Sequence, residues 1–134
     1  MKLRYLLLIF LPVLYSACGN HAHEQVAIEL NNGQKWKVNE EMKPYIEQGR
    51  EVLTSYLSKG SADHEKLAKE LQEQNSKLIK SCTMDGKSHD ELHKWLHPHL
   101  ELVKELRDAE TEDEVTEITE KLKSSYDLYD QYFE

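Results

Sequence analysis

The chain has 134 residues, of which 17 are Lys or Arg and 25 are Asp or Glu, so its formal net charge is −8. This length suits a single domain with its own hydrophobic core. Because an acidic chain repels a phosphate backbone, nucleic acid is not expected as a partner, whereas metal ions and cationic proteins stay open as partners.

The first residues are typical of an export signal. A short basic start is followed by an apolar run over residues 6–14, which is too short to span a membrane. Two small residues then precede Cys18, an order that resembles a bacterial lipobox, although Tyr15 stands where Leu is usual. We expect residues 1–17 to be removed as a lipoprotein signal peptide, Cys18 to carry the lipid, and residues 18–23 to form a short tether. An ordinary secretory signal with an incidental cysteine is the alternative.

Export changes the charge and the thiol count. Without residues 1–17 the chain keeps 15 basic and 25 acidic residues, a net charge of −10, and Cys82 becomes the free thiol beside the lipidated Cys18. We expect Cys18 to hold the protein in a lipid bilayer, at the outer or the cell membrane. The domain is expected to face the periplasm, with exposure at the cell surface as the alternative.

Residues 24–38 are predicted to form a β-hairpin. Apolar and polar residues alternate on both sides of Asn31-Asn32-Gly33, a sequence typical of a tight turn. Because a lone hairpin is marginally stable in water, its apolar face is expected to rest on helices. That face comprises Val26, Ile28, Leu30, Trp36 and Val38.

Four amphipathic helices are predicted from apolar side chains that recur at helical spacing. They cover residues 39–59, 61–82, 88–109 and 111–133. Asn39 is expected to cap the first helix, and two capping boxes, Ser88 with Glu91 and Thr111 with Glu114, to begin the third and the fourth. Short connections between helices favour an antiparallel up-and-down bundle. Residues 24–134 are therefore predicted to be one mainly α domain, a four-helix bundle preceded by the hairpin.

Residues 82–99 hold the side chains that indicate chemistry, including four of the seven histidines. His89, His93 and His97 are four residues apart, so a helix projects them from one face, which is a usual way to present imidazoles to one metal ion. His89 and His99 fall inside the apolar stripe of this helix, where a histidine is more often a hydrogen-bonded core residue than a ligand.

An antiparallel bundle would bring further ligand types to the same end. The start of the first helix and the turn before the third would meet there. Thiolate, thioether and imidazole together suit Cu(I), and Zn(II) can bind through Cys and His. The candidate metal ligands are Cys82, Met84, His89, His93 and Met42, with His97 and His99 as secondary candidates.

Haem b is an alternative cofactor, because a Met on the first helix and a His on a later one resemble the four-helix b-type cytochromes. The axial pair would be Met42 with His89 or His93. Covalent haem is excluded because the Cys-x-x-Cys-His attachment sequence is absent from the chain. Since no nucleophile–base–acid set stands out, we expect no enzymatic activity.

One long stretch resembles a block found in small exported lipoproteins of Bacteroidota. It is the run Cys82-Thr83-Met84-x-Gly86-x-x-His89-x-x-Leu92-His93-x-Trp95-Leu96-x-Pro98. The Asn32-Gly33-x-Lys35-Trp36 stretch and the lipobox fit the same group. The resemblance implies an exported, single-domain lipoprotein and implies no activity and no catalytic residue.

Two functions are consistent with these patterns. The first is a non-enzymatic lipoprotein that binds a transition metal or haem in the cell envelope. The second is an interaction module that docks an envelope protein partner, with the histidines serving the fold alone.

Overall fold

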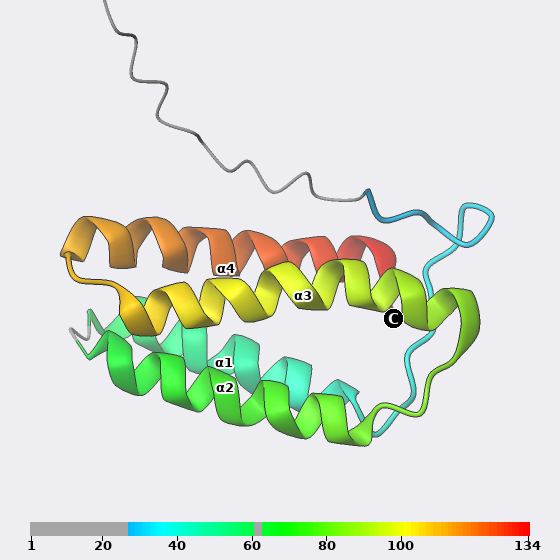
Figure 1. The fold of residues 1–134 in the computed structure, drawn as a ribbon, viewed down its shortest axis with the longest axis horizontal. Helices are drawn as coiled ribbons and strands as arrows, with labels where there is room; N and C mark the ends of the chain where they lie inside the picture. The colour runs from blue at the N-terminus through cyan, green and yellow to red at the C-terminus, as the bar shows by residue number, and fades with distance from the viewer. Residues whose placement is uncertain (1–26, 61–62) are drawn as a thin grey trace, which may run out of the picture.

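The computed structural model describes residues 27–60 and 63–134. These residues form four α-helices: α1 (Lys43–Lys59), α2 (His64–Ser81), α3 (Gly86–Asp108) and α4 (Glu112–Tyr132). Helices consecutive in the chain pack against each other in an up-and-down order, which confirms the predicted mainly α bundle (Figure 1). The expected signal peptide, Cys18, the tether and the predicted start of the second helix at residue 61 lie outside the described residues.

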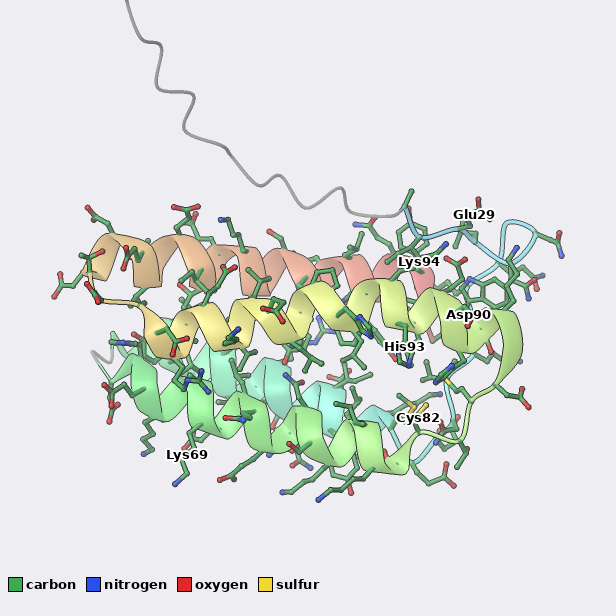
Figure 2. All side chains as sticks on the ribbon, viewed as in Figure 1. Glu29, Lys69, Cys82, Asp90, His93 and Lys94 are labelled. Carbon is green, nitrogen blue, oxygen red and sulfur yellow. The ribbon has the colours of Figure 1, made fainter. Side chains whose placement is uncertain are left out.

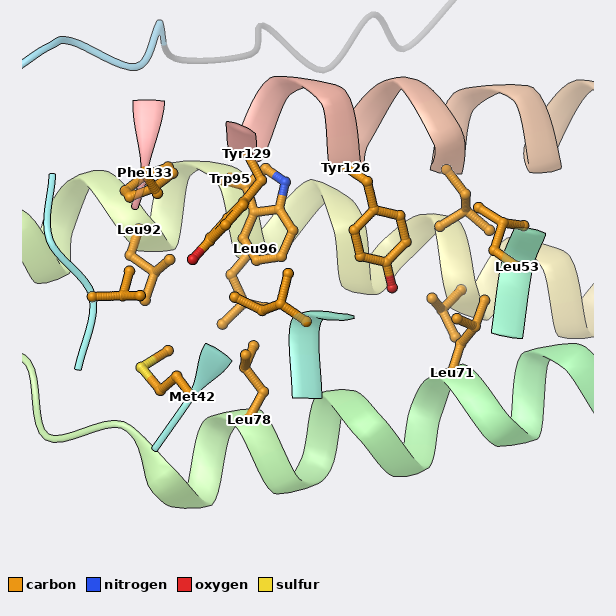
Figure 3. Packing of buried hydrophobic residues seen from close by; sticks show 14 of the residues in the cluster. Met42, Leu53, Leu71, Leu78, Leu92, Trp95, Leu96, Tyr126, Tyr129 and Phe133 are labelled. Carbon is orange, nitrogen blue, oxygen red and sulfur yellow. The ribbon is translucent and has the colours of Figure 1, made fainter. Parts of the chain in front are cut away.

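One hydrophobic core runs along the bundle, as Figure 3 shows. All four helices contribute to it, because each turns its apolar stripe inward. Burial of a large apolar side chain contributes about 1.5–3 kcal/mol to stability. The largest fully buried side chains are Trp95, Phe133, Met42, Leu71, Leu78, Leu92, Leu106, Leu122 and His99.

The predicted β-hairpin is wrong for the part of it that the structure describes, residues 27–38; residues 24–26 lie outside. Its turn does form: Asn31 and Gln34 exchange backbone hydrogen bonds of 2.8 and 3.0 Å. Asn32 and Gly33 have φ angles of 52° and 83° there, as a type I′ turn requires. No strand pairing between the two arms continues past this turn within residues 27–38.

The hairpin stops at its turn because the backbone groups of Glu29 and Trp36, the next pair that would bond across the arms, form hydrogen bonds with other groups. A longer hairpin would pair Glu29 with Trp36, yet the Glu29 N–H donates to the Glu91 carboxylate at 2.8 Å. The indole of Trp36 donates to the Glu29 carbonyl at 2.6 Å. The backbone of Trp36 pairs in parallel with the end of α4, donating to Tyr132 O at 2.7 Å and accepting from Glu134 N at 2.9 Å. Tertiary contacts therefore replace the expected cross-strand ladder.

The first helix begins at Lys43, later than predicted, because Asn39 does not cap it. The Asn39 amide nitrogen donates to Ser81 O at 2.9 Å, and its side-chain oxygen accepts from Thr83 N at 3.2 Å. Asn39 thus fastens the connection between α2 and α3. Pro44 lies in the first turn of α1, where its missing N–H costs no helical hydrogen bond.

The third helix also begins differently from its prediction. It starts at Gly86, so Ser88 lies inside its first turn and donates to Asp85 O at 3.0 Å. The predicted Ser88–Glu91 capping box is therefore wrong, since the Glu91 carboxylate is used elsewhere. The Thr111–Glu114 box at the start of α4 is confirmed.

Candidate metal centre

His89, His93 and His97 lie on successive turns of α3 and touch one another in sequence; we call these three residues the histidine ladder. Nε2 of His89 lies 3.0 Å from Nε2 of His93. Nδ1 of His93 lies 2.9 Å from Nε2 of His97. The corresponding ring centres are 4.3 and 5.0 Å apart. His93 therefore occupies the middle of the ladder and uses a different ring nitrogen toward each neighbour.

The ladder lies at the border between core and solvent. His89 and His93 are half-buried, and His97 is exposed. Burial lowers the pKa of His93, and the neighbouring His89 and His97 lower it further, although Asp90 acts in the opposite direction. The lowered pKa keeps His93 neutral at neutral pH, and a neutral imidazole has a nitrogen lone pair available to a metal ion.

Cys82 and Met84 lie in the connection between α2 and α3, half-buried against the core. Cys82 is the C-cap of α2, and its N–H donates to Ile79 O at 3.3 Å. The Asn39 side chain holds the residues on both sides of it. Figure 2 shows Cys82 and His93 at the same end of the bundle, on different elements. The thiol is free among the described residues.

The structure places Met42 in the hydrophobic core, with its side chain fully buried (Figure 3). A haem with a Met42 axial ligand would have to draw that sulfur out of the packing. The other half of the haem pair, His89 or His93, belongs to the histidine ladder, which is partly exposed. The packing of Met42 therefore does not fit the haem alternative.

His99 is also a core residue, with 0% of its surface exposed. Its Nδ1 lies 3.0 Å from Ser125 Oγ, and its ring stacks on Trp95 and meets the edge of Tyr126. Burial lowers its pKa to about 4. Its Nε2 has no hydrogen-bond partner among the described residues, so the tautomer with the proton on Nδ1 is the one that leaves no buried donor unpaired.

The histidine ladder brings its ring nitrogens close together two at a time, and no point in it is shared by three. Across residues 27–60 and 63–134, no three His, Cys, Asp or Glu side chains form a group that could hold a metal ion. Two nitrogens that bind one zinc ion at 2.0–2.1 Å, with bond angles of about 90–110°, lie roughly 2.9–3.4 Å apart. The His89–His93 contact of 3.0 Å fits this range. His89 and His93 are therefore spaced as two neighbouring ligands of one metal ion would be.

An ion pair beside the ladder was not anticipated from the sequence. Glu91 is only 3% exposed, and its carboxylate accepts from Lys94 Nζ at 2.7 Å and from Glu29 N at 2.8 Å. Burial acts to raise the pKa of Glu91, but these hydrogen bonds and the charges of Lys94 and Lys87 outweigh it and lower the pKa. The only sequence signal was the three-residue spacing of Glu91 and Lys94, which many surface pairs share.

No helix within the described part of the chain is long and apolar enough to cross a membrane.

Comparison with known proteins finds no matching family model, no matching curated protein and no matching solved structure. The resemblance to exported Bacteroidota lipoproteins therefore stays a prediction from the sequence.

Proposed function

We propose that this protein is a lipid-anchored lipoprotein of the cell envelope that binds a transition metal ion, zinc or copper, at the histidine ladder. The observation that carries the proposal is the 3.0 Å approach of His89 Nε2 to His93 Nε2. Two imidazoles one helical turn apart need not approach each other, because each can form hydrogen bonds with water or with a backbone group. Here their metal-binding atoms face each other.

The orientation of these two rings supports ligation. Two imidazoles joined end to end by a straight N–H···N hydrogen bond of 3.0 Å would have ring centres about 5.3 Å apart. The centres of His89 and His93 are 4.3 Å apart. The two rings therefore do not lie end to end but meet at an angle, with their planes inclined by 57°. A metal ion that replaces the hydrogen bond between them would bind both nitrogens at once.

The ligand types restrict the metal. Imidazole suits zinc and copper, and carboxylate-preferring ions such as Mg²⁺ and Ca²⁺ do not select it. Cys82 and Met84 lie at the same end of the bundle, on the connection that Asn39 fastens. A thiolate or thioether from this connection would add a soft ligand and favour copper. A net acidic protein also attracts cations over a longer range.

The lipobox supports the location. An exported, lipidated protein with a short tether would work close to a membrane surface, in the handling or sensing of metal ions in the envelope. No catalytic residues are required for that role.

Metal uptake by the untagged protein tests the proposal. His21 and His23 lie outside the described residues, so both are replaced by Ala in every sample to remove their contribution. We expect this protein to hold close to one equivalent of zinc or copper after dialysis, and the metal to raise its melting temperature by mass action. His93→Ala should abolish both effects.

The matched control is His64→Gln. His64 lies at the opposite end of α2 from the ladder and contacts Ala109 O at 3.2 Å. This variant loses an imidazole and should keep the metal. A folded protein that takes up neither metal, or a His93→Ala variant that binds as well as its parent, contradicts the proposed function.

A further inference from the structure

We propose that His97 is a positioning residue for the metal site: it accepts a hydrogen bond from Nδ1–H of His93 and so leaves Nε2 of His93 free to bind metal beside His89. This inference rests on the proposed function, because it assigns distinct roles within the same ladder. It makes His89 and His93 the ligands, and it places His97 outside the coordination shell.

The two contacts of His93 differ in geometry. An end-to-end hydrogen bond of 2.9 Å between two imidazoles places the ring centres about 5.2 Å apart. The centres of His93 and His97 are 5.0 Å apart, close to that value. The centres of His89 and His93 are 4.3 Å apart, although their nitrogens are separated by a similar distance. Both contacts have hydrogen-bond geometry, but the His97 ring lies nearly end to end with that of His93, whereas the His89 ring meets it at a steeper angle.

The position of the single N–H proton on neutral His93 determines the role of both contacts. A neutral ring carries one N–H, so His93 has its proton either on Nδ1 or on Nε2. A proton on Nε2 would point at His89 and occupy the position that the metal needs. A proton on Nδ1 donates to Nε2 of His97 and leaves the lone pair of His93 Nε2 facing His89. The hydrogen bond to His97 therefore selects the tautomer that is able to bind metal.

His97 is suited to this role by its exposure. To accept from His93, its Nε2 must be unprotonated, so its own proton sits on Nδ1. Because His97 is exposed, water can accept a hydrogen bond from its Nδ1–H without cost to the fold. Metal-binding histidines commonly donate their second N–H to such an outer partner, and loss of the partner typically lowers metal affinity 10- to 100-fold.

Zinc titration and ring-nitrogen NMR of the same samples test the inference. The parent is the protein with His21 and His23 replaced by Ala. We expect it to bind one zinc ion and to show His93 protonated at Nδ1, both without metal and with zinc. His97→Ala should keep the stoichiometry of one, weaken zinc binding 10- to 100-fold, and shift the proton of metal-free His93 toward Nε2. His97→Gln, whose amide oxygen can accept from Nδ1–H, should recover part of the affinity and the original tautomer.

Three outcomes overturn the inference. Zinc affinity of His97→Ala within twofold of its parent would show that His97 positions nothing. A parent that binds two zinc ions, one of which is lost in His97→Ala, would make His97 a ligand. A His93 proton on Nε2 in the metal-free parent would reverse the proposed hydrogen bond. A parent that binds no zinc or copper overturns the proposed function itself, whereas zinc binding that ignores His97 overturns only its positioning role.

Discussion

Gly49 of α1 lies directly against the hydroxyl group of Tyr126 of α4. A methyl group at position 49 would overlap that oxygen, and it would also touch the Cζ atom of the same ring and the Cβ of Gln74. Gly49 is buried in the middle of a helix, where glycine is unfavourable by roughly 1 kcal/mol compared with alanine. The chain therefore trades helix propensity for close packing of α1 against the tyrosine.

Gly49→Ala should destabilise the protein by about 1–3 kcal/mol, although alanine is the better helix former, because the added methyl overpacks the core. Chemical denaturation measures this directly. Tyr126→Phe removes the oxygen that the methyl meets, so the double variant should regain most of the loss. If the double variant is no more stable than Gly49→Ala alone, the contact with the Tyr126 hydroxyl is not the cause.

His99 should make the protein less stable in mild acid. Burial lowers its pKa from 6.5 to about 4, so between these values the unfolded chain binds a proton that the folded chain does not. The contribution of neutral His99 to the free energy of unfolding is fully present above pH 6.5. It declines by about 3 kcal/mol in total as the pH falls to about 4. Denaturation curves at several pH values should show a shallower decline for His99→Leu than for the parent.

The test of His99 compares how steeply the stability of the parent and of His99→Leu falls with pH, not their stabilities at one pH. The leucine variant also loses the hydrogen bond to Ser125, so its stability at pH 7 changes for another reason. The lowered pKa of His93 acts in the same pH range and is common to both proteins. Parallel slopes in the two proteins between pH 6.5 and 4 would show that His99 does not titrate as its burial requires.

Glu91→Gln should remove about 1–2 kcal/mol of stability at pH 7, because hydrogen bonds to a charged group are the stronger ones and Lys94 would lose its anion. The folded pKa of Glu91 is below the usual 4.5. Its contribution is therefore present above pH 4.5 and is lost as the pH falls below that value. The parent and the variant should converge in stability at low pH, and a constant difference down to pH 2 would contradict this origin.

Cys82→Ser tests whether the thiol takes part in metal binding. A thiolate ligand matters more for copper in its reduced state than for zinc held by imidazoles. We expect the variant to lose at least tenfold in affinity for Cu(I) under reducing conditions and to lose less for zinc. Competition with a Cu(I)-binding dye measures the first and calorimetry the second. Unchanged affinity for both ions would leave the histidines as the site.

Cys18→Ser should release the protein from the membrane. If Cys18 carries the lipid, the serine variant cannot be acylated and should move from the membrane fraction to the soluble extract of the envelope. Cell fractionation followed by immunoblotting gives the answer. Equal membrane content of the variant and its parent would indicate an ordinary signal peptide or a different means of attachment.

The helices were predictable because their apolar residues recur with the period of the helix, and the Thr111–Glu114 box was predictable because it is a local pattern. The predicted capping roles of Asn39 and Glu91 are wrong because their hydrogen-bond partners are not local. Each has a side chain suited to a nearby cap, yet each bonds to a residue far away in the chain, Ser81 and Thr83 for Asn39 and Glu29 for Glu91. Spacing along one helix could place His93 beside His89 and His97, but it could not tell which ring nitrogen faces which neighbour.

Lys94 Nζ donates a hydrogen bond of 3.2 Å to Ala27 O, and if Cys18 carries a lipid this bond limits how far the ladder can lie from the membrane. Lys94 follows His93 directly on α3, so Ala27 is bonded to the same helical turn as the middle histidine. Nine residues lead from Cys18 to Ala27, and nine residues span at most about 30 Å even when fully extended. With Cys18 lipidated, residues 18–27 would therefore keep the histidine-bearing end of α3 close to the lipid bilayer. The histidines would then meet ions and partners within a thin layer at the bilayer surface.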